Sequence, residues 1–132
     1  MNFFFDNNLS PRIARALAEL FKDEHIVVAL RDKFEPNVTD VEWMQGLAAE
    51  GRWIVISGDR KIRKNSAEFH TFRNSPLVGF FMAKSLYKAS VVRQTERLLN
   101  QWPDIIALAG AVGGGAMYEM TLGRGRIKQL SV

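Results

Sequence analysis

The sequence predicts an α/β fold: a single three-layer α/β/α domain built on a mostly parallel sheet. Two observations predict this fold. Short apolar runs with the composition of buried strands alternate with stretches in which apolar residues recur at helical spacing. Most of these stretches also begin at a side chain that caps helices. Strands separated by helices pair in parallel through right-handed crossovers, and 132 residues suit a single domain.

The first half of the chain supplies a β-α-β-α-β order. The expected strands are residues 2–5, 25–30 and 53–56. A serine followed by a proline opens a first helix that should cover residues 10–22. Thr39 and Glu42 have the spacing of a capping box, so a second helix should begin there and end at Gly51. Residues 31–38 are charged and contain a proline, which predicts a loop.

The second half should extend the same sheet. Its expected elements are helices over residues 67–73 and 90–102, a strand over residues 77–83 and a glycine-rich loop over residues 110–115. Pro103 should end the second helix because proline lacks the backbone N–H. Residues 118–122 and 126–130 predict a terminal hairpin at about residues 117–131.

The composition excludes several classes of protein. The chain has no cysteine, so disulfides and thiolate metal sites are excluded, and it has only two histidines. No apolar run approaches the length of a membrane span. The apolar run of residues 3–5 is interrupted by Asp6 and does not form a signal peptide. We therefore expect a cytoplasmic protein.

Charge is distributed unevenly along the chain. Residues 1–59 carry six Lys/Arg against ten Asp/Glu, whereas residues 60–132 carry twelve against four. Four cations, Arg60, Lys61, Arg63 and Lys64, follow Asp59 almost directly. They could be a solvated basic face or could hold the phosphates of a polyanion beside an acidic pocket.

Three aspartates stand at the ends of predicted elements. Asp6 ends the first strand, Asp40 opens a helix and Asp59 follows the third strand. The carboxyl ends of parallel strands form the ligand-binding edge of such a sheet. Carboxylates gathered there repel one another, and an all-oxygen ligand set favours Mg²⁺ or Mn²⁺, which can activate water for phosphodiester hydrolysis.

Each aspartate also has a purely structural interpretation. Asp6 could form an Asx-turn, Asp40 could complement the helix dipole, and Asp59 could belong to an ordinary turn. An aspartate after a third strand is also found in phospho-receiver domains. Those domains carry an acidic pair after the first strand, where this chain has Asp6 followed by two asparagines.

Three features of the sequence occur together: the three aspartates in this order, the strand WIVIS ending in Gly58-Asp59, and the start FFFDNNLSPRIARAL. In these features the chain resembles the PIN-like superfamily of ribonucleases. The resemblance covers residues 2 to about 80, and its nearest branch is similar to VapC-type toxins of type II toxin–antitoxin modules. It implies a Mg²⁺- or Mn²⁺-dependent endoribonuclease with Asp6, Asp40 and Asp59 as metal-binding and catalytic positions. It also implies an RNA substrate and a cognate antitoxin, and it leaves open a homodimer.

The chain departs from the pattern of this superfamily at a fourth acidic position. Glu35, Glu42 and Glu68 are the candidates for that ligand. Asn7 and Asn8 stand where relatives often carry an acid, and the amide of Asn8 could instead orient water or a substrate phosphate. If the cluster around Lys61 serves only solubility, the RNA path would move to other cations: Arg93, Arg97, Arg124, Arg126 or Lys128. The alternative function is a non-catalytic PIN-like module that binds RNA or protein.

Overall fold

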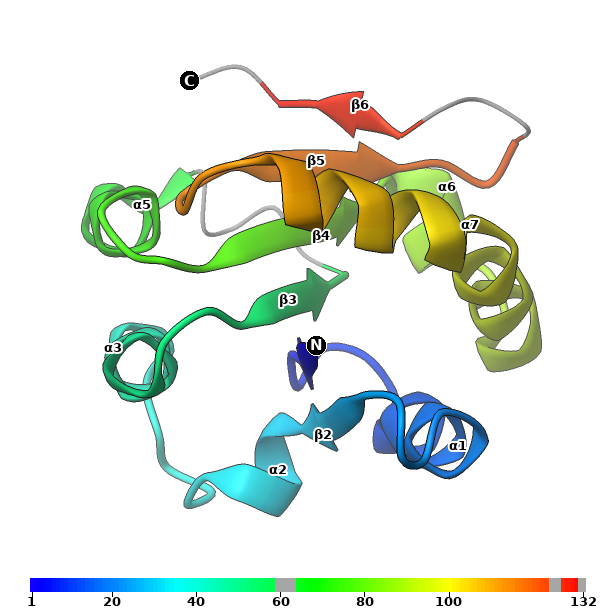
Figure 1. Ribbon diagram of the computed structural model, residues 1–132, viewed down its shortest axis with the longest axis horizontal. Coiled ribbons are helices and arrows are strands. Elements are labelled where there is room, and N and C mark those ends of the chain that lie inside the picture. Colours follow the sequence, from blue (N-terminus) through cyan, green and yellow to red (C-terminus); the bar gives the residue numbers. More distant parts are fainter. Residues whose placement is uncertain (59–63, 124–126, 131–132) are drawn as a thin grey trace.

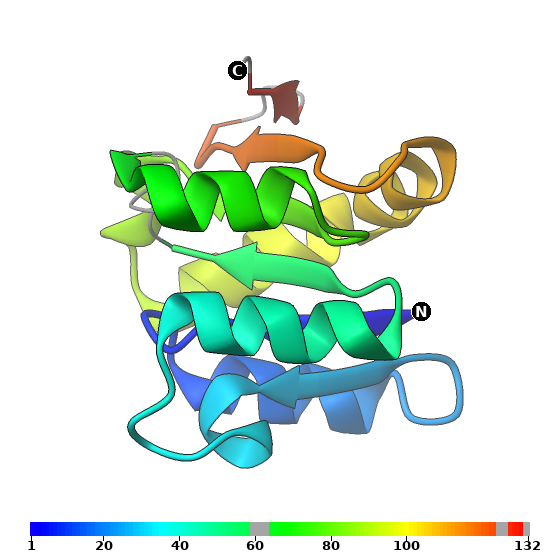
Figure 2. The same cartoon turned by 90° about the vertical axis from the view of Figure 1, so that its left-hand side faces the viewer.

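A mostly parallel sheet with helices on both faces forms the molecule, as predicted (Figures 1 and 2). The computed structural model describes residues 1–58, 64–123 and 127–130. Its strands are β1 (Asn2–Phe5), β2 (Ile26–Ala29), β3 (Ile54–Ser57), β4 (Val78–Met82), β5 (Met117–Met120) and β6 (Lys128–Gln129). Their spatial order is β2-β1-β3-β4-β5-β6, and only the pairing of β5 with β6 is antiparallel in the described sheet.

Capping side chains begin four of the described helices. The helices are α1 (Pro11–Leu20), α2 (Leu30–Lys33), α3 (Asp40–Glu50), α5 (Ser66–Arg73), α6 (Lys84–Tyr87) and α7 (Val91–Ala111). Side chains of Ser10, Thr39, Asn65 and Ser90 accept hydrogen bonds from the first turns of α1, α3, α5 and α7. Gly51 ends α3 with φ +120°, a backbone conformation that favours glycine. None of the described helices is long and apolar enough to cross a membrane.

Two hydrophobic cores sandwich the sheet. Figure 1 shows α1 and α7 on one face and α3 and α5 on the other. Successive side chains of β1 alternate between these faces. Phe3 stacks on Trp102 of α7 with ring centroids 4.3 Å apart, whereas Phe4 packs on Trp43 of α3 at 4.8 Å. Strands buried on both faces read as continuous apolar runs, which explains the Phe3–Phe5 triplet.

The prediction that Pro103 ends its helix is wrong. Helix α7 continues through Pro103 to Ala111, and Figure 1 shows its two halves running in different directions. Proline removes one intrahelical hydrogen bond and kinks a helix. The residues beyond it still pack on the sheet, because Ile105 and Ala109 are fully buried. The predicted glycine loop therefore starts only after Ala111.

Two one-turn helices replace predicted irregular segments. The expected loop at residues 31–38 begins with α2, whose following residue Phe34 packs edge-on against Phe4 at 5.9 Å. Helix α6 follows β4 and was not predicted. The buried face of α7 is not purely apolar, since Val92 is 79% exposed while Gln94 and Arg97 are buried.

The direction of the chain connections reverses between β1 and β3, which are neighbours in the sheet. The chain leaves β1 through α1 on one face of the sheet and leaves β3 toward α5 on the other face. A change of direction between neighbouring parallel strands is the usual ligand site of an open α/β sheet. The carboxyl ends of β1 and β3 are therefore where this fold favours a ligand site.

Candidate active site at the carboxyl ends of β1 and β3

Asp6 lies at the carboxyl end of β1 and is nearly buried, 9% exposed. It directly follows the buried strand β1, and its backbone N–H donates to the carbonyl of Ile56 in β3 at 2.9 Å. Its own carbonyl accepts from the N–H of Leu9 at 3.1 Å, which closes the turn toward α1. The position of Asp6 is thus fixed by the parallel sheet and by the turn.

Both oxygens of the Asp6 carboxylate accept hydrogen bonds. Oδ1 accepts from the N–H of Asn7 at 2.7 Å, and Oδ2 accepts from the fully buried hydroxyl of Ser57 at 3.0 Å. The Asn8 amide donates to Ser57 Oγ at 3.2 Å and accepts from the N–H of Gly58 at 3.0 Å. We call Asp6, Asn8, Ser57 and Gly58 the Asp6 corner. It connects the ends of β1 and β3 through side chains.

An arginine lies beside this corner. Arg31 of α2 donates through Nε and a terminal nitrogen to Oδ1 of Asn7, at 3.3 and 3.1 Å. The segment around it is held by Arg15 of α1, which donates two hydrogen bonds to the Asp32 carboxylate at 3.0 and 2.9 Å. This pairing lowers the pKa of Asp32 and raises the pKa of Arg15. The guanidinium of Arg31 therefore lies on Asn7, the residue that follows Asp6.

Asp40 is placed at the same edge of the sheet but already has a local partner. It is the first residue of α3, and Figure 2 shows this end of α3 at the side toward which the arrowheads of β2 and β3 point. Its half-buried carboxylate accepts from the indole N–H of Trp43 at 2.9 Å. This bond orients the carboxylate, and a carboxylate oxygen keeps a second lone pair.

The other predicted site residues are placed unequally. Asp59, Arg60, Lys61 and Arg63 lie outside the described residues. Lys64 is exposed just before α5. Among the candidates for the fourth acid, Glu35 is exposed, Glu42 belongs to the capping box with Thr39, and Glu68 is in the first turn of α5.

Two of the alternative RNA-contacting cations are engaged within the protein. Arg97 is only 8% exposed and donates to the carbonyls of Thr121 and Gly123. Arg93 pairs with Glu96 one helical turn away. Lys128 is exposed on β6, whereas Arg124 and Arg126 lie outside the described residues. Arg97 is therefore a structural residue that fastens the β5–β6 connection to α7.

The donor chemistry of the corner suits a hard divalent cation. Carboxylate, hydroxyl and amide oxygens are the ligands that Mg²⁺ and Mn²⁺ prefer, and metal-ligating carboxylates are themselves usually hydrogen-bonded. Within residues 1–58, 64–123 and 127–130, no three His, Asp or Glu side chains come together as a metal site. The described residues thus provide two oriented carboxylates at this edge of the sheet, those of Asp6 and Asp40.

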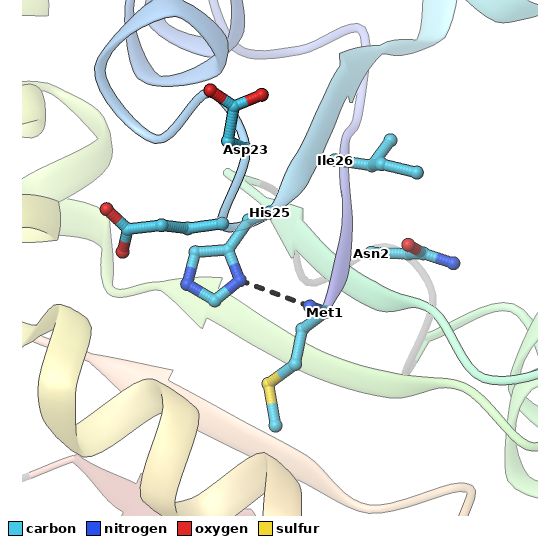
Figure 3. Close-up of a pocket in the computed structure, with 6 residues that line it drawn as sticks. Met1, Asn2, Asp23, His25 and Ile26 are labelled. Atoms are coloured by element: carbon cyan, nitrogen blue, oxygen red, sulfur yellow. Dashed lines mark hydrogen bonds between the residues drawn. The ribbon is translucent and has the colours of Figure 1, made fainter.

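Two pockets of the described residues lie at the opposite edge of the sheet. The pocket in Figure 3 has a volume of about 320 Å³ and is lined by residues at the amino ends of β1 and β2: Met1, Asn2, Asp23, Glu24, His25 and Ile26. His25 Nδ1 contacts the amine of Met1 at 3.1 Å. Partial burial, and to a smaller extent the positive charge of that amine, lowers the pKa of His25. No predicted site residue lines this pocket. We assign the site to the Asp6 corner because the nearly buried carboxylate of Asp6 lies there.

Two residues of the site were not predicted. Ser57 was not predicted as a site residue, although it ends β3; the adjacency of β1 and β3 places its hydroxyl beside Asp6. Arg31 was assigned to a loop, and no sequence pattern indicated that it reaches Asn7.

Comparison with known protein families identifies the domain. A family model described as a PIN-like domain matches residues 1–84, which include β1 to β4 and the whole Asp6 corner. No curated protein and no solved structure matches the chain. PIN-like domains are generally nucleases, and PIN domains typically use divalent metals. Because the matched residues make up more than half of the sequence, the chain belongs to the PIN-like domain family.

Proposed function

We propose that this PIN-like domain is an endoribonuclease that hydrolyses RNA phosphodiesters with Mg²⁺ or Mn²⁺ held by Asp6, Asp40 and Asp59. The observation that carries the proposal is the Asp6 carboxylate, nearly buried and held by Ser57 at the ends of β1 and β3. An oriented carboxylate at this edge, in a family of nucleases, supports a catalytic use better than a purely structural one.

The residues around Asp6 have separate roles in this proposal. The ion, when bound, would lower the pKa of a water molecule and stabilise charge on the phosphate oxygens. Ser57 fixes the Asp6 carboxylate through its hydroxyl. The Asn8 amide, held by Ser57 and Gly58, would orient the substrate phosphate. Arg31 beside Asn7, with Arg60, Lys61, Arg63 and Lys64, would neutralise the RNA backbone.

Replacing the proposed ligands tests the proposal. Asp6→Asn and Asp59→Asn keep side-chain size but remove a negative charge from the site. We expect each to lower the rate of RNA cleavage in Mg²⁺ or Mn²⁺ by at least about 10²-fold, because metal activation of water contributes several kcal/mol. Asp104→Asn, at an exposed position of α7, is the matched control and should cleave like the parent.

The outcomes separate the two candidate functions. A parent protein that binds RNA but shows no metal-dependent cleavage would identify a non-catalytic binding module. Cleavage that survives in Asp6→Asn at the parent rate would show that the corner is not the active site.

The finer proposal is that the nuclease acts as the toxin of a type II toxin–antitoxin module. It is supported by the start of the chain, FFFDNNLSPRIARAL, and by the acidic corner that a basic antitoxin segment could cover. Expression of the parent should then slow growth, Asp6→Asn should not, and co-expression of the neighbouring reading frame should restore growth. Normal growth with abundant, folded parent protein would contradict the toxin role.

A further inference from the structure

Helix α6 carries an exposed aromatic side chain at the edge of the sheet where the Asp6 corner lies. It follows β4, the neighbour of β3, and Figure 2 places it at the side toward which the strand arrowheads point. Tyr87, the last residue of α6, is 39% exposed. An exposed tyrosine on so short a helix does not contribute to either hydrophobic core.

The ring of Tyr87 lies directly on the Asp6 corner. A Cβ atom added to Gly58 would lie 2.3 Å from Cδ1 and 2.4 Å from Cε1 of Tyr87, so glycine at this position lets the ring approach the backbone. The N–H of Gly58 donates to Asn8, which in turn donates to Ser57. Tyr87 thus contacts Gly58, and Gly58 is hydrogen-bonded to Asn8, the side chain that we propose orients the phosphate.

The short helix is held firmly in spite of its length. Gln94 of α7 is 5% exposed, and its amide donates to the carbonyls of Leu86 and Tyr87 at 3.3 and 3.0 Å. Leu86 is fully buried in the core beneath the helix. These contacts satisfy carbonyls that a helix end otherwise leaves unpaired, and they fix the backbone that carries the ring.

Two lysines accompany the tyrosine. Lys84 and Lys88 are exposed at the two ends of α6, four residues apart and thus on one side of the helix. Neither has an ion-pair partner within the described parts of the chain. We call Lys84, Tyr87 and Lys88 the α6 platform.

We infer that the α6 platform binds single-stranded RNA beside the active site, with one base stacked on Tyr87 and the backbone phosphates contacted by the lysines. This inference rests on the proposed nuclease function and adds where the substrate lies. Cationic side chains interleaved with an exposed aromatic ring are the usual means of binding single strands without sequence preference. An acidic corner repels phosphate, so cations beside it are needed to hold the strand.

The test is RNA affinity, measured by fluorescence anisotropy in the Asp59→Asn background to prevent turnover. Tyr87→Ala should weaken binding of a labelled single-stranded RNA by at least about fivefold, and Tyr87→Phe should bind as the background protein does. Lys84→Gln with Lys88→Gln should weaken binding and reduce the slope of log K against log salt by roughly 1.4, about 0.7 per phosphate contact. Lys22→Gln, an exposed lysine after α1, is the matched control for charge.

A second readout distinguishes stacking from a structural effect of the alanine variant. The probes are RNAs that each lack a single base but keep every phosphate. At least one of them should bind the Asp59→Asn protein, which retains Tyr87, at least about fivefold more weakly than intact RNA. The Tyr87→Ala protein should bind that RNA and intact RNA equally. If both proteins respond to base removal in the same way, the platform inference fails while the nuclease proposal stands. If the Asp59→Asn protein binds no RNA although the parent cleaves it, the platform inference fails alone; if the parent neither binds nor cleaves RNA, both fail.

Discussion

The hydroxyl of Ser57 determines how the carboxylate of Asp6 is presented. A carboxylate removed from water is stable only where its oxygens accept hydrogen bonds, and Asp6 receives them from Asn7 and Ser57. Ser57 itself is fully buried and is approached by the Asn8 amide. We regard Ser57 as a positioning residue, because it acts on the chemistry through Asp6.

Ser57→Ala should therefore impair both the cleavage rate and the stability of the fold. It removes the donor to Asp6 Oδ2 and the acceptor for Asn8, at a cost of about 1–3 kcal/mol in the free energy of unfolding. We expect the cleavage rate to fall about 10- to 100-fold, the usual effect of losing a partner of a metal ligand. Urea denaturation and a cleavage assay titrated with Mn²⁺ measure the two effects.

The metal titration distinguishes positioning from general damage. A positioning role predicts that higher Mn²⁺ concentrations restore part of the lost rate in Ser57→Ala. A variant that loses stability but cleaves like the parent at every metal concentration would show that Ser57 only supports the fold.

At the residue scale, the sequence predicted that Asp6 and Asp40 stand at the ends of elements, but not which side chains surround them. Asp6 and Asp40 were recognised because they stand at element ends, which local patterns define. The bond from Ser57 to Asp6 spans 51 residues, and the bond from Arg31 to Asn7 spans 24. Such contacts depend on strand order and loop path, which the local pattern does not contain.

At the scale of elements, the capping box of α3 has a direct bearing on the site. Thr39 Oγ1 accepts from the N–H of Glu42 at 3.2 Å, and the Glu42 carboxylate accepts from the N–H of Thr39 at 2.9 Å. These bonds define where α3 begins and hence where Asp40 stands. They also give Glu42 a structural use, which argues against it as the fourth acidic ligand.

Two variants separate the capping role of Glu42 from a ligand role. Thr39→Ala should lower the free energy of unfolding by about 1 kcal/mol. Glu42→Gln keeps an acceptor for the N–H of Thr39 and should cleave RNA at the parent rate. A loss of cleavage in Glu42→Gln with an unchanged unfolding curve would instead identify Glu42 as a ligand.

The pH dependence of the same cap has a definite sign. The hydrogen bond from the Thr39 backbone lowers the pKa of Glu42 below its ordinary value of 4.5. The charged form is therefore favoured in the folded protein, so this stabilisation is complete above pH 4.5 and is lost as the pH falls through the lowered pKa. Unfolding curves of Glu42→Gln should lack this part of the acid destabilisation.

Elements that depend on tertiary packing were the ones that sequence patterns missed. Proline in a helix interior costs about 3 kcal/mol, yet α7 passes through Pro103 because Trp102, Ile105 and Ala109 are buried on either side of it. Helices α2 and α6 are single turns, too short for a periodic pattern. By contrast, the start of every capped helix could be predicted, since a cap is a local interaction.

At the scale of the whole molecule, strand order is what turns separate motifs into a site. The alternation of strands and helices predicted a parallel sheet, but it did not reveal that β1 and β3 are neighbours. That adjacency brings Asp6, Ser57 and Gly58 together, and the next strand outward brings α6 and its lysines to the same edge. Lys84 and Lys88 of the second half of the chain thereby lie at the same edge of the sheet as Asp6 of the first half.

The central claim is that a divalent ion binds at the Asp6 corner, and paramagnetic line broadening locates such an ion directly. Substoichiometric Mn²⁺ added to ¹⁵N-labelled protein should broaden the amide signals of Asn7, Asn8 and Gly58 first, and Asp6→Asn should abolish this selectivity. Broadening centred instead on Asp23 and Glu24, the acidic residues of the pocket at the opposite edge, or spread evenly over the surface, would contradict the account.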